Sequence, residues 1–370
     1  MLLVGVASAQ LPPEPQVNAD RTVTFRLSDP AATSASVFLY ERPGPLKMKR
    51  DVAGLWTATS GPLAPEIYAY RFDVDGRPIL DPGNVDTRSS TQAVANVFIV
   101  PGASAQPWET TSVPHGVVHR HVFTSKVVLG LDHGQDEFYV YTPPGYDAHA
   151  ATKYPVLYLL HGWSQTAQDW VKIGHAPDIL DNLIAAGKVK PMILVMPTGY
   201  GEMSFVRSGF GVWDDPQKIT RNVELFQKSL LTEVIPQAES MYNVLPGREN
   251  RAIAGLSMGG LEALVVGLEN TGVFASTAGF SAAVPSDPPP TIAALDPKKA
   301  NLKLLWIACG SSDNLVGANH RFAAALKAHG FALTSIETPG RHDWLVWRDD
   351  LVRFAPLLFR SAGLSAAPRQ

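Results

Sequence analysis

The sequence predicts a mostly parallel β-sheet covered by helices on both faces, preceded by a small antiparallel β-sandwich. From about residue 16 to 100, short strands with alternating polarity follow one another and no credible helix occurs. From about residue 120, continuous apolar strands alternate with helices, which is the pattern of a parallel sheet buried on both faces. A third observation is the octet 253–260, which places a G-x-S-x-G pattern between a buried strand and an apolar helix.

The composition is that of a globular protein with a substantial core. The chain has 370 residues, of which 45% are hydrophobic and 18% charged, so it is long enough for two domains. A formal charge of −3 gives no basic field for nucleic acid or an anionic membrane. The sequence contains no 18-residue apolar run, so no membrane span is expected, and nothing in it indicates an oligomeric state.

The N-terminus predicts export. Residues 1–10 look like the tail of a signal peptide, with a short apolar core and small residues near Ala9, although a basic start is missing. We therefore expect a secreted or periplasmic bacterial protein; the alternative is an apolar N-terminus or a misassigned gene start. The single cysteine, Cys309, excludes an intrachain disulfide and ends the apolar run 304–308, so a buried thiol is expected.

Five strands define the predicted sandwich over residues 16–100, separated by turns rich in Pro, Gly and Asp. They are expected at 22–27, 36–40, 55–59, 67–74 and 94–100. Residues 101–114 are small and polar and are expected to form a linker.

The α/β domain is expected over residues 115–362. Its predicted strands are 154–160, 192–196, one ending before Ser257, 273–280, 302–308 and 332–337. Its predicted helices are 179–186, 223–242, one beginning at the serine, 322–329 and 345–359. The proline-rich segment 284–297 is expected to form a cap.

Ser257 is the predicted nucleophile. A serine in a tight strand-to-helix turn has a strained backbone that exposes its hydroxyl, and only small neighbours such as Gly255 and Gly259 fit beside it. Acyl transfer by such a serine needs a base, an acid and an oxyanion hole. In sheet folds of this kind the acid and then the base follow the serine, each on a loop at a strand's carboxyl end.

His342 is the predicted base. Three histidines follow the serine, and His320 and His329 lie in a predicted helix where a surface or capping role is expected. His342 lies in the segment 338–344, directly after the strand 332–337, which is where the base must be.

Asp313 is the predicted acid because it follows the core strand 302–308 at the edge of the site. Asp287 and Asp296, in the proline-rich segment, are the alternatives. Asp343 is adjacent to the base in sequence and would have difficulty facing its imidazole. The other interpretation of Asp313 is that it only caps the next helix.

The oxyanion hole is expected to use two backbone N–H groups. One belongs to Met258, which follows the nucleophile, and the other to Trp163, in the loop after the strand 154–160. Gly162 permits the turn of that loop. His161 is a candidate substrate contact, although a structural hydrogen bond is the favoured role.

The loop after the strand 192–196 alternates glycine with aromatic residues and opens on the same face of the sheet. This suits a flat aromatic acyl group or sugar rings, while packing at the domain edge is an equal alternative. The candidate substrate contacts are Gly162, Tyr200, Phe210, Trp213 and, after the base, Trp344, with Phe205 in the same loop.

Several segments carry a family resemblance. They are 158–162, 179–184, 195–197, 248–260, Cys309-Gly310 before Asp313, and 340–344 with Trp347. From about 120 to 360 the chain resembles the esterase-D-like α/β-hydrolases of carbohydrate esterase family one, especially bacterial feruloyl and acetylxylan esterases. Through 68–76 and 81–84, residues 16–100 resemble the immunoglobulin-like domain that often precedes such esterases, akin to carbohydrate-binding family forty-eight.

The resemblance implies an α/β-hydrolase with the triad Ser257, Asp313 and His342, acting on feruloyl esters of plant cell-wall polysaccharide or its oligosaccharides. The alternatives are an acetylxylan esterase, an acyltransferase to a sugar acceptor and, less favoured, a non-catalytic carbohydrate-binding protein. No ligand-spaced His/Cys/carboxylate cluster and no phosphate-binding glycine loop occur in the sequence, so neither metal nor organic cofactor is expected.

Overall fold

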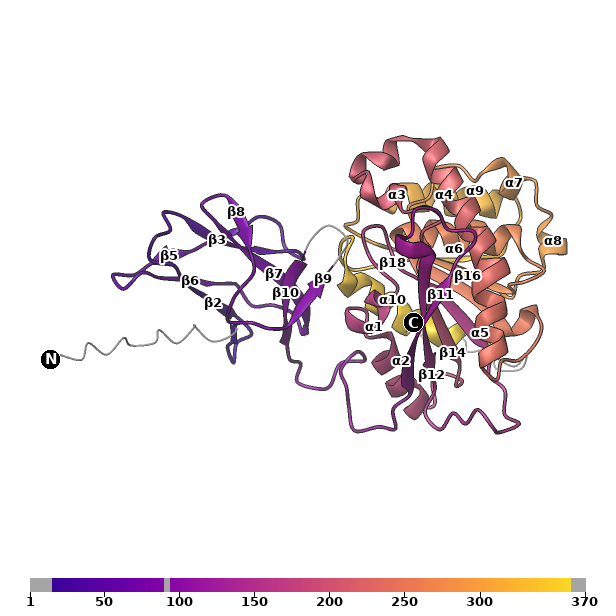
Figure 1. Ribbon diagram of the computed structural model, residues 1–370, viewed down its shortest axis with the longest axis horizontal. Helices are drawn as coiled ribbons and strands as arrows, with labels where there is room; N and C mark the ends of the chain where they lie inside the picture. The colour runs from indigo at the N-terminus through magenta and orange to yellow at the C-terminus, as the bar shows by residue number, and fades with distance from the viewer. Residues whose placement is uncertain (1–14, 90–93, 361–370) are drawn as a thin grey trace. The chain divides into compact units, whose positions relative to one another are not determined.

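The computed structural model describes residues 15–89 and 94–360, and the chain divides into two compact units, Met1–Gln106 and Pro107–Gln370 (Figure 1). The division falls inside the segment 101–114, where the sequence predicts a linker. The predicted signal peptide at residues 1–10 and the last two residues of the predicted range 115–362 lie outside the described residues.

The described part of the first unit consists of two antiparallel sheets. Their orders are β1-β2-β6-β5 and β4-β3-β7-β10-β9, with β8 paired to β7. Aromatic rings join the sheets: Phe25 lies 5.1 Å from Tyr70 and 5.5 Å from Phe98, centroid to centroid. The strands are β1 Gln16–Val17, β2 Val23–Ser28, β3 Ala35–Leu39, β4 Leu46–Lys47, β5 Lys49–Arg50, β6 Leu55–Thr59, β7 Glu66–Val74, β8 Arg77–Ile79, β9 Thr87–Ser89 and β10 Val94–Val100. The five predicted strands all form; the immunoglobulin-like assignment stays a prediction.

The described residues of the second unit form one sheet in the order β11-β12-β14-β13-β15-β16-β17-β18. From β14 to β18 the neighbours are parallel, while β11 and β12 are antiparallel. The strands are β11 Val117–Thr124, β12 Gln135–Thr142, β13 Val156–Leu160, β14 Ile193–Pro197, β15 Arg251–Leu256, β16 Ser276–Phe280, β17 Leu304–Gly310 and β18 Thr334–Thr338. The chain adds β14 on one side of β13 and β15 to β18 on the other, so the order reverses at the carboxyl ends of β13 and β15.

Helices cover both faces of this sheet (Figure 1). Leu305 and Ile307 on β17 pack with residues of α6 and α9, whereas the intervening Trp306 packs on Phe354 of α10 at 5.5 Å between ring centroids. The helices are α1 Asp169–Lys172, α2 Ala176–Ala185, α3 Ser204–Arg207, α4 Pro216–Ser229, α5 Ile235–Met241, α6 Ser257–Glu269, α7 Pro290–Ala293, α8 Pro297–Ala300, α9 Val316–Ala328 and α10 Trp344–Phe354; short 3₁₀ turns are Asp132–Gly134, Phe210–Asp214, Arg248–Asn250 and Ala355–Leu357.

The helix predicted at 223–242 begins earlier. Asp215 caps α4 by accepting hydrogen bonds from the N–H groups of Gln217 and Lys218, and Pro216 occupies its first position. The helix then continues through a π-helical turn, Leu230–Val234, into α5, which contains a proline at its start. In a π-helical turn each N–H donates to the carbonyl five residues earlier, so the helix continues although Pro236 has no N–H to donate.

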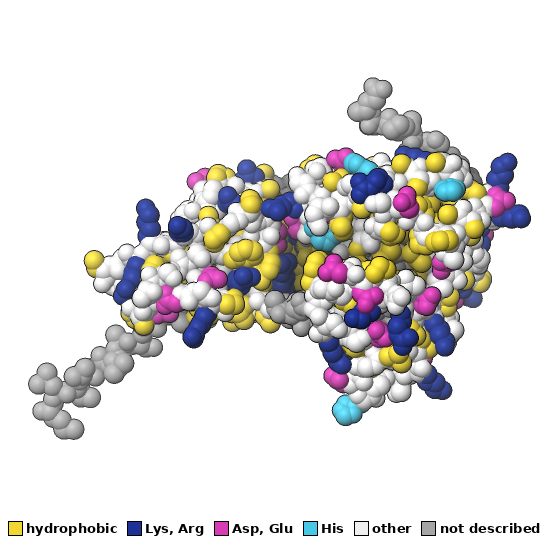
Figure 2. Space-filling model, turned by 90° about the horizontal axis from the view of Figure 1, so that it is seen from above, with side chains coloured by type: hydrophobic (Ala, Val, Ile, Leu, Met, Phe, Trp, Pro, Cys, Tyr) yellow, Lys and Arg dark blue, Asp and Glu magenta, His cyan; other side chains and the backbone are white. Residues whose placement is uncertain are grey.

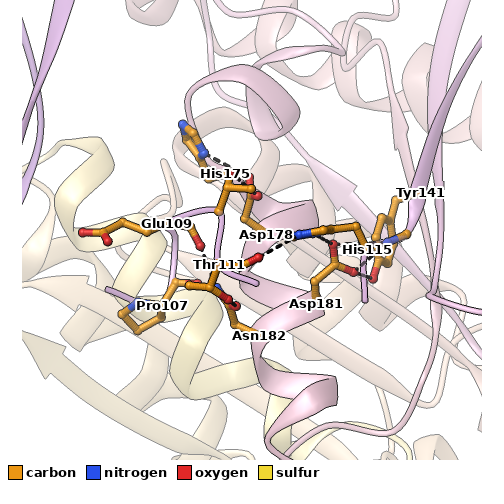
Figure 3. A network of polar contacts seen from close by, with 11 residues as sticks. Pro107, Glu109, Thr111, His115, Tyr141, His175, Asp178, Asp181 and Asn182 are labelled. Atoms are coloured by element: carbon orange, nitrogen blue, oxygen red, sulfur yellow. Dashed lines mark hydrogen bonds and ion pairs between the residues drawn. The ribbon is translucent and has the colours of Figure 1, made fainter. Parts of the chain in front are cut away.

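Residues 107–116, in the second half of the predicted linker, are bonded to α2 (Figure 3). The His115 ring lies between the Asp181 carboxylate at 3.0 Å and the Thr111 carbonyl at 2.9 Å. Tyr141 donates to the same carboxylate at 2.6 Å, and the Asn182 amide donates to backbone carbonyls of the segment. This stretch is therefore part of the second unit.

The proline-rich segment 284–297, which is expected to form a cap, packs against the nucleophile helix α6. Ile292 is fully buried and packs in the same apolar cluster as Leu261 and Leu264 of α6. The segment thus extends the core beside the nucleophile helix.

Charged side chains of both signs are interspersed on the face drawn in Figure 2, without a large area of one sign. This distribution agrees with the small net charge of −3. Among the described residues, every helix is too short or too polar to cross a bilayer.

Candidate active site

Ser257 stands at the sharp turn between β15 and α6. Its φ is 51°, a left-handed conformation that a non-glycine residue adopts only when the surroundings enforce it. The surroundings are tight: a Cβ on Gly259 would meet the His161 carbonyl oxygen at 2.3 Å, and one on Gly255 would meet the Gly259 carbonyl oxygen at 2.4 Å. The small flanking residues are therefore needed for the helix to pack against β13 and β15.

The structure brings the three residues predicted from chain order together. The Ser257 hydroxyl lies 3.0 Å from His342 Nε2, and His342 Nδ1 lies 2.8 Å from Asp313 Oδ2. The imidazole also packs edge-on against Trp347, 5.0 Å between ring centroids. A neutral imidazole with Nδ1–H directed at the carboxylate leaves Nε2 free to accept the serine proton.

Asp313 remains ionised in this setting. Burial would raise its pKa, but the hydrogen bond and charge of His342 and the N–H of Leu315, which donates at 2.8 Å, outweigh burial and hold the pKa below its ordinary value. The capping interpretation is wrong, because Leu315 is the N-cap of α9 and no side chain caps that helix. One oxygen of Asp313 instead accepts the Leu315 N–H in the turn before α9, while the other faces the imidazole.

The other carboxylates considered for this role have different positions. Asp296 caps α8 and Asp343 caps α10 through its contact with the Val346 N–H at 3.3 Å. His320 Nε2 lies 3.0 Å from Glu337 Oε1, and both side chains are exposed.

The loop after β13 lies against the nucleophile. A Cβ on Gly162 would come within 3.3 Å of the Ser257 Cβ. The Gly162 N–H donates to Gln165 Oε1 at 2.8 Å, so it is engaged within the loop and is not the donor to an oxyanion. Met258 begins the first turn of α6, where N–H groups have no helical acceptor. The assignment of the Met258 and Trp163 N–H groups to the oxyanion hole stays a prediction.

His161 does not face substrate. It is 1% exposed, with Nδ1 2.8 Å from the Gly162 carbonyl and Nε2 accepting the Gly199 N–H at 3.0 Å. Burial lowers its pKa to about 4, so the ring is neutral and links the loops that follow β13 and β14. The structural role favoured from the sequence agrees with this geometry, and the substrate contact does not.

The predicted aromatic contacts divide by exposure. Phe210 is 72% exposed and its ring lies 5.5 Å from that of the half-buried Trp163, which packs in the same apolar cluster as Met258. Tyr200 and Trp344 are 1% and 4% exposed, so the expectation that they touch substrate is wrong. Tyr200 donates to the Gln165 carbonyl, and Trp344 packs between Trp170 and Trp347.

Trp213 is half-buried and packs on the buried Phe205 at 5.3 Å, as the alternative of edge packing expects.

Three residues near the site were missed from the sequence. Gln165 fixes the oxyanion loop, Glu262 is fully buried in α6, and Asp350 is fully buried in α10 beneath the base-bearing loop. A charged residue inside the apolar run 260–268 was a visible signal for Glu262. Within the described ranges, no group of three or more His, Cys, Asp or Glu is placed to hold a metal ion.

The parallel sheet with a hydrogen-bonded Ser-His-Asp set at its carboxyl edge defines an α/β-hydrolase-like esterase. A family model described as "Putative esterase" matches residues 134–358. The chain belongs to this esterase family.

Relatives carry names that agree with this class. A protein of Xylanibacter ruminicola named endo-1,4-beta-xylanase/feruloyl esterase is 32% identical over 94% of this chain, and the chain spans 46% of that relative. The structure of the CE1 ferulic acid esterase of Anaeromyces mucronatus is similar with a TM-score of 0.58 at 25% identity, covering 68% of this chain and 93% of that one. The enterobactin esterase of Shigella flexneri, 18% identical, shares the fold over 94% of this chain and 96% of its own with a TM-score of 0.66.

Proposed function

We propose that the protein is a serine carboxylesterase that hydrolyses feruloyl (hydroxycinnamoyl) esters of plant cell-wall polysaccharide through an acyl-enzyme. The observation that carries the mechanism is the continuous set of contacts from the Ser257 hydroxyl through His342 to the ionised Asp313. The name of the Xylanibacter relative supports the substrate class.

In the proposed acylation step the Ser257 oxygen attacks the ester carbonyl while His342 Nε2 takes the serine proton. The N–H groups of Met258 and Trp163 stabilise the oxyanion of the tetrahedral intermediate. The C–O bond to the sugar then breaks, and the imidazolium returns its proton to the departing sugar oxygen. Asp313 keeps its negative charge throughout and stabilises the imidazolium.

In the deacylation step water attacks the acyl-enzyme. His342 takes a proton from that water and later returns it to the Ser257 oxygen, which releases the free carboxylic acid. Transfer to a sugar acceptor would use the same groups with a sugar hydroxyl in place of water, and it would yield acylated acceptor in excess of free acid.

The exposed ring of Phe210 beside Trp163 supports an aromatic acyl group. An edge-to-face pair at the border of the site offers one ring face to a planar hydroxycinnamoyl ring, whereas an acetyl group would gain little from it. Residues 1–10 resemble the tail of a signal peptide, and we therefore propose a secreted or periplasmic location. This location is consistent with the proposed substrate, because cell-wall polysaccharide is extracellular.

The test compares hydrolysis of methyl ferulate and of acetylated xylan by the wild type and by Ser257→Ala. We expect ferulate release by the wild type and a loss of about 10⁴-fold or more in the variant, because the nucleophile is absent. Acetate release alone would keep the serine mechanism and replace feruloyl by acetyl specificity. A Ser257→Ala protein with near-wild-type turnover would overturn the mechanism.

A further inference from the structure

The nucleophile helix carries a buried carboxyl group that the proposed reaction does not use. Glu262 lies in α6 with no exposed surface. Its Oε1 accepts a hydrogen bond from the Asn222 amide at 3.2 Å, and its Oε2 has no partner among the described residues. Burial raises the pKa of Glu262 well above its ordinary value and thus favours the neutral, protonated form of the side chain.

Asn222 connects this carboxyl to the loop after β14. Its Oδ1 accepts the N–H groups of Gly201 at 3.0 Å and Glu202 at 3.3 Å. The two backbone donors set the orientation of the amide, because a flipped amide would direct its N–H groups at them. In this orientation the amide nitrogen faces Glu262, which holds it as the acceptor.

The free oxygen of Glu262 lies at the same loop. A Cβ on Gly199 would be 3.3 Å from Glu262 Oε2 and 3.4 Å from His161 Cε1. The Gly199 N–H donates to His161, whose other ring nitrogen contacts the Gly162 carbonyl. Glu262 on α6 is thus connected to the loop after β14, and His161 connects that loop to the loop after β13.

We propose that Glu262 is a positioning residue for the oxyanion hole, which through Asn222 and the Gly199–His161 contact sets the place of the Trp163 N–H relative to Ser257. The inference rests on the proposed acyl-enzyme function. A neutral acid suits this role, since a carboxylate behind the oxyanion hole would oppose the negative charge that develops there.

The experiment measures kcat and KM with p-nitrophenyl acetate, whose small acyl group does not depend on the aromatic contacts. Glu262→Gln keeps an acceptor for Asn222 and cannot ionise, so it should retain kcat. Glu262→Met keeps the length of the side chain but removes the acceptor, and we expect kcat to fall about 10-fold with KM within about two-fold, because a displaced donor weakens transition-state binding. Asn222→Ala should reproduce this loss.

The matched control is Thr277→Val, which removes a buried hydrogen bond from β16 to the Ala263 carbonyl of the same helix, at 2.8 Å, away from the oxyanion loop. It should lower the melting temperature and leave kcat unchanged. The proposal is overturned if Glu262→Met or Asn222→Ala retains the kcat of the control, or if Glu262→Gln is as damaging as Glu262→Met. A Ser257→Ala protein that still turns over would instead overturn the proposed function.

Discussion

Two walls of the candidate site differ in how directly the sequence determines them. The edge that carries Ser257, Asp313 and His342 consists of side chains placed by the ends of three core strands. The second wall, the loop 199–214, packs against Met258 and holds aromatic rings whose exposure ranges from 1% at Tyr200 to 72% at Phe210. Strand order fixes the first wall, whereas the second depends on which ring turns inward.

The largest effect should come from the strand-determined wall. In Asp313→Asn the amide can donate to His342 Nδ1, which favours the tautomer that cannot accept the Ser257 proton. We expect kcat for methyl ferulate to fall by about 10³–10⁴-fold with little change in KM.

The control for this variant is Asp343→Asn, next to the base. Asp343 caps α10, and asparagine is an equally good cap, so turnover should stay within about three-fold. Equal losses in the two variants would show that Asp313 is not the acid.

This wall could be predicted because each residue follows a recognisable strand, buried in the case of β15 and β17 and largely half-exposed in the case of β18 at the sheet edge. Ser257 follows β15, Asp313 follows β17 and His342 follows β18, and the carboxyl ends of parallel strands meet at one edge. The expected strands and the structure differ there by only a few residues. The paired strands β11 and β12 were missed from the sequence. His119, Arg120 and His121 give β11 no apolar run, and this strand is largely exposed at the sheet edge. The signal for β12 was present, since its residues alternate in burial along Gln135–Thr142.

The second wall could not be predicted to the same degree, since an aromatic residue in a loop suits either the core or the surface. Tyr200 and Phe210 have similar sequence surroundings, rich in glycine, yet only one is buried. The choice depends on contacts from distant segments, such as the Gln165 carbonyl that accepts the Tyr200 hydroxyl. The bonds from residues 107–116 to α2 were unpredictable for the same reason.

A substitution of intermediate effect should distinguish the exposed ring of Phe210 from the buried ring of Phe205 in the same loop. Phe210→Ala removes the ring face proposed to contact the acyl group, so KM for methyl ferulate should rise about 10-fold, equivalent to about 1.4 kcal/mol of aromatic contact. Its kcat/KM for p-nitrophenyl acetate should remain within about two-fold of the wild type.

Phe205→Leu is the buried counterpart in the same loop, since Phe205 is 1% exposed. It should lower the free energy of unfolding by about 1–2 kcal/mol. The ratio of kcat/KM for methyl ferulate to kcat/KM for p-nitrophenyl acetate should stay unchanged. If Phe210→Ala also leaves that ratio unchanged, the exposed ring has no part in acyl selection.

The smallest effect concerns stability behind the strand-determined wall. Asp350 is fully buried, accepts a hydrogen bond from Thr338 just before the loop of His342, and leaves Oδ2 without a partner among the described residues. Burial raises its pKa to about 7. The folded state therefore holds this proton more tightly than the unfolded state, and stability falls as the pH rises from the ordinary aspartate range to about 7.

Asp350→Asn keeps the acceptor for Thr338 and cannot ionise, so its melting temperature should match the wild type near pH 4 and exceed it by several degrees at pH 8. Asp349→Asn provides the contrast: this exposed carboxylate pairs with Arg353 at 2.8 Å, and its loss should lower the melting temperature slightly at pH 8. A pH-independent difference for Asp350→Asn would mean that the carboxyl is not held neutral. In that case Asp350 would carry a negative charge in the folded protein, buried behind the loop of His342. The position of that loop would then depend on the ends of the core strands and not on a neutral Asp350.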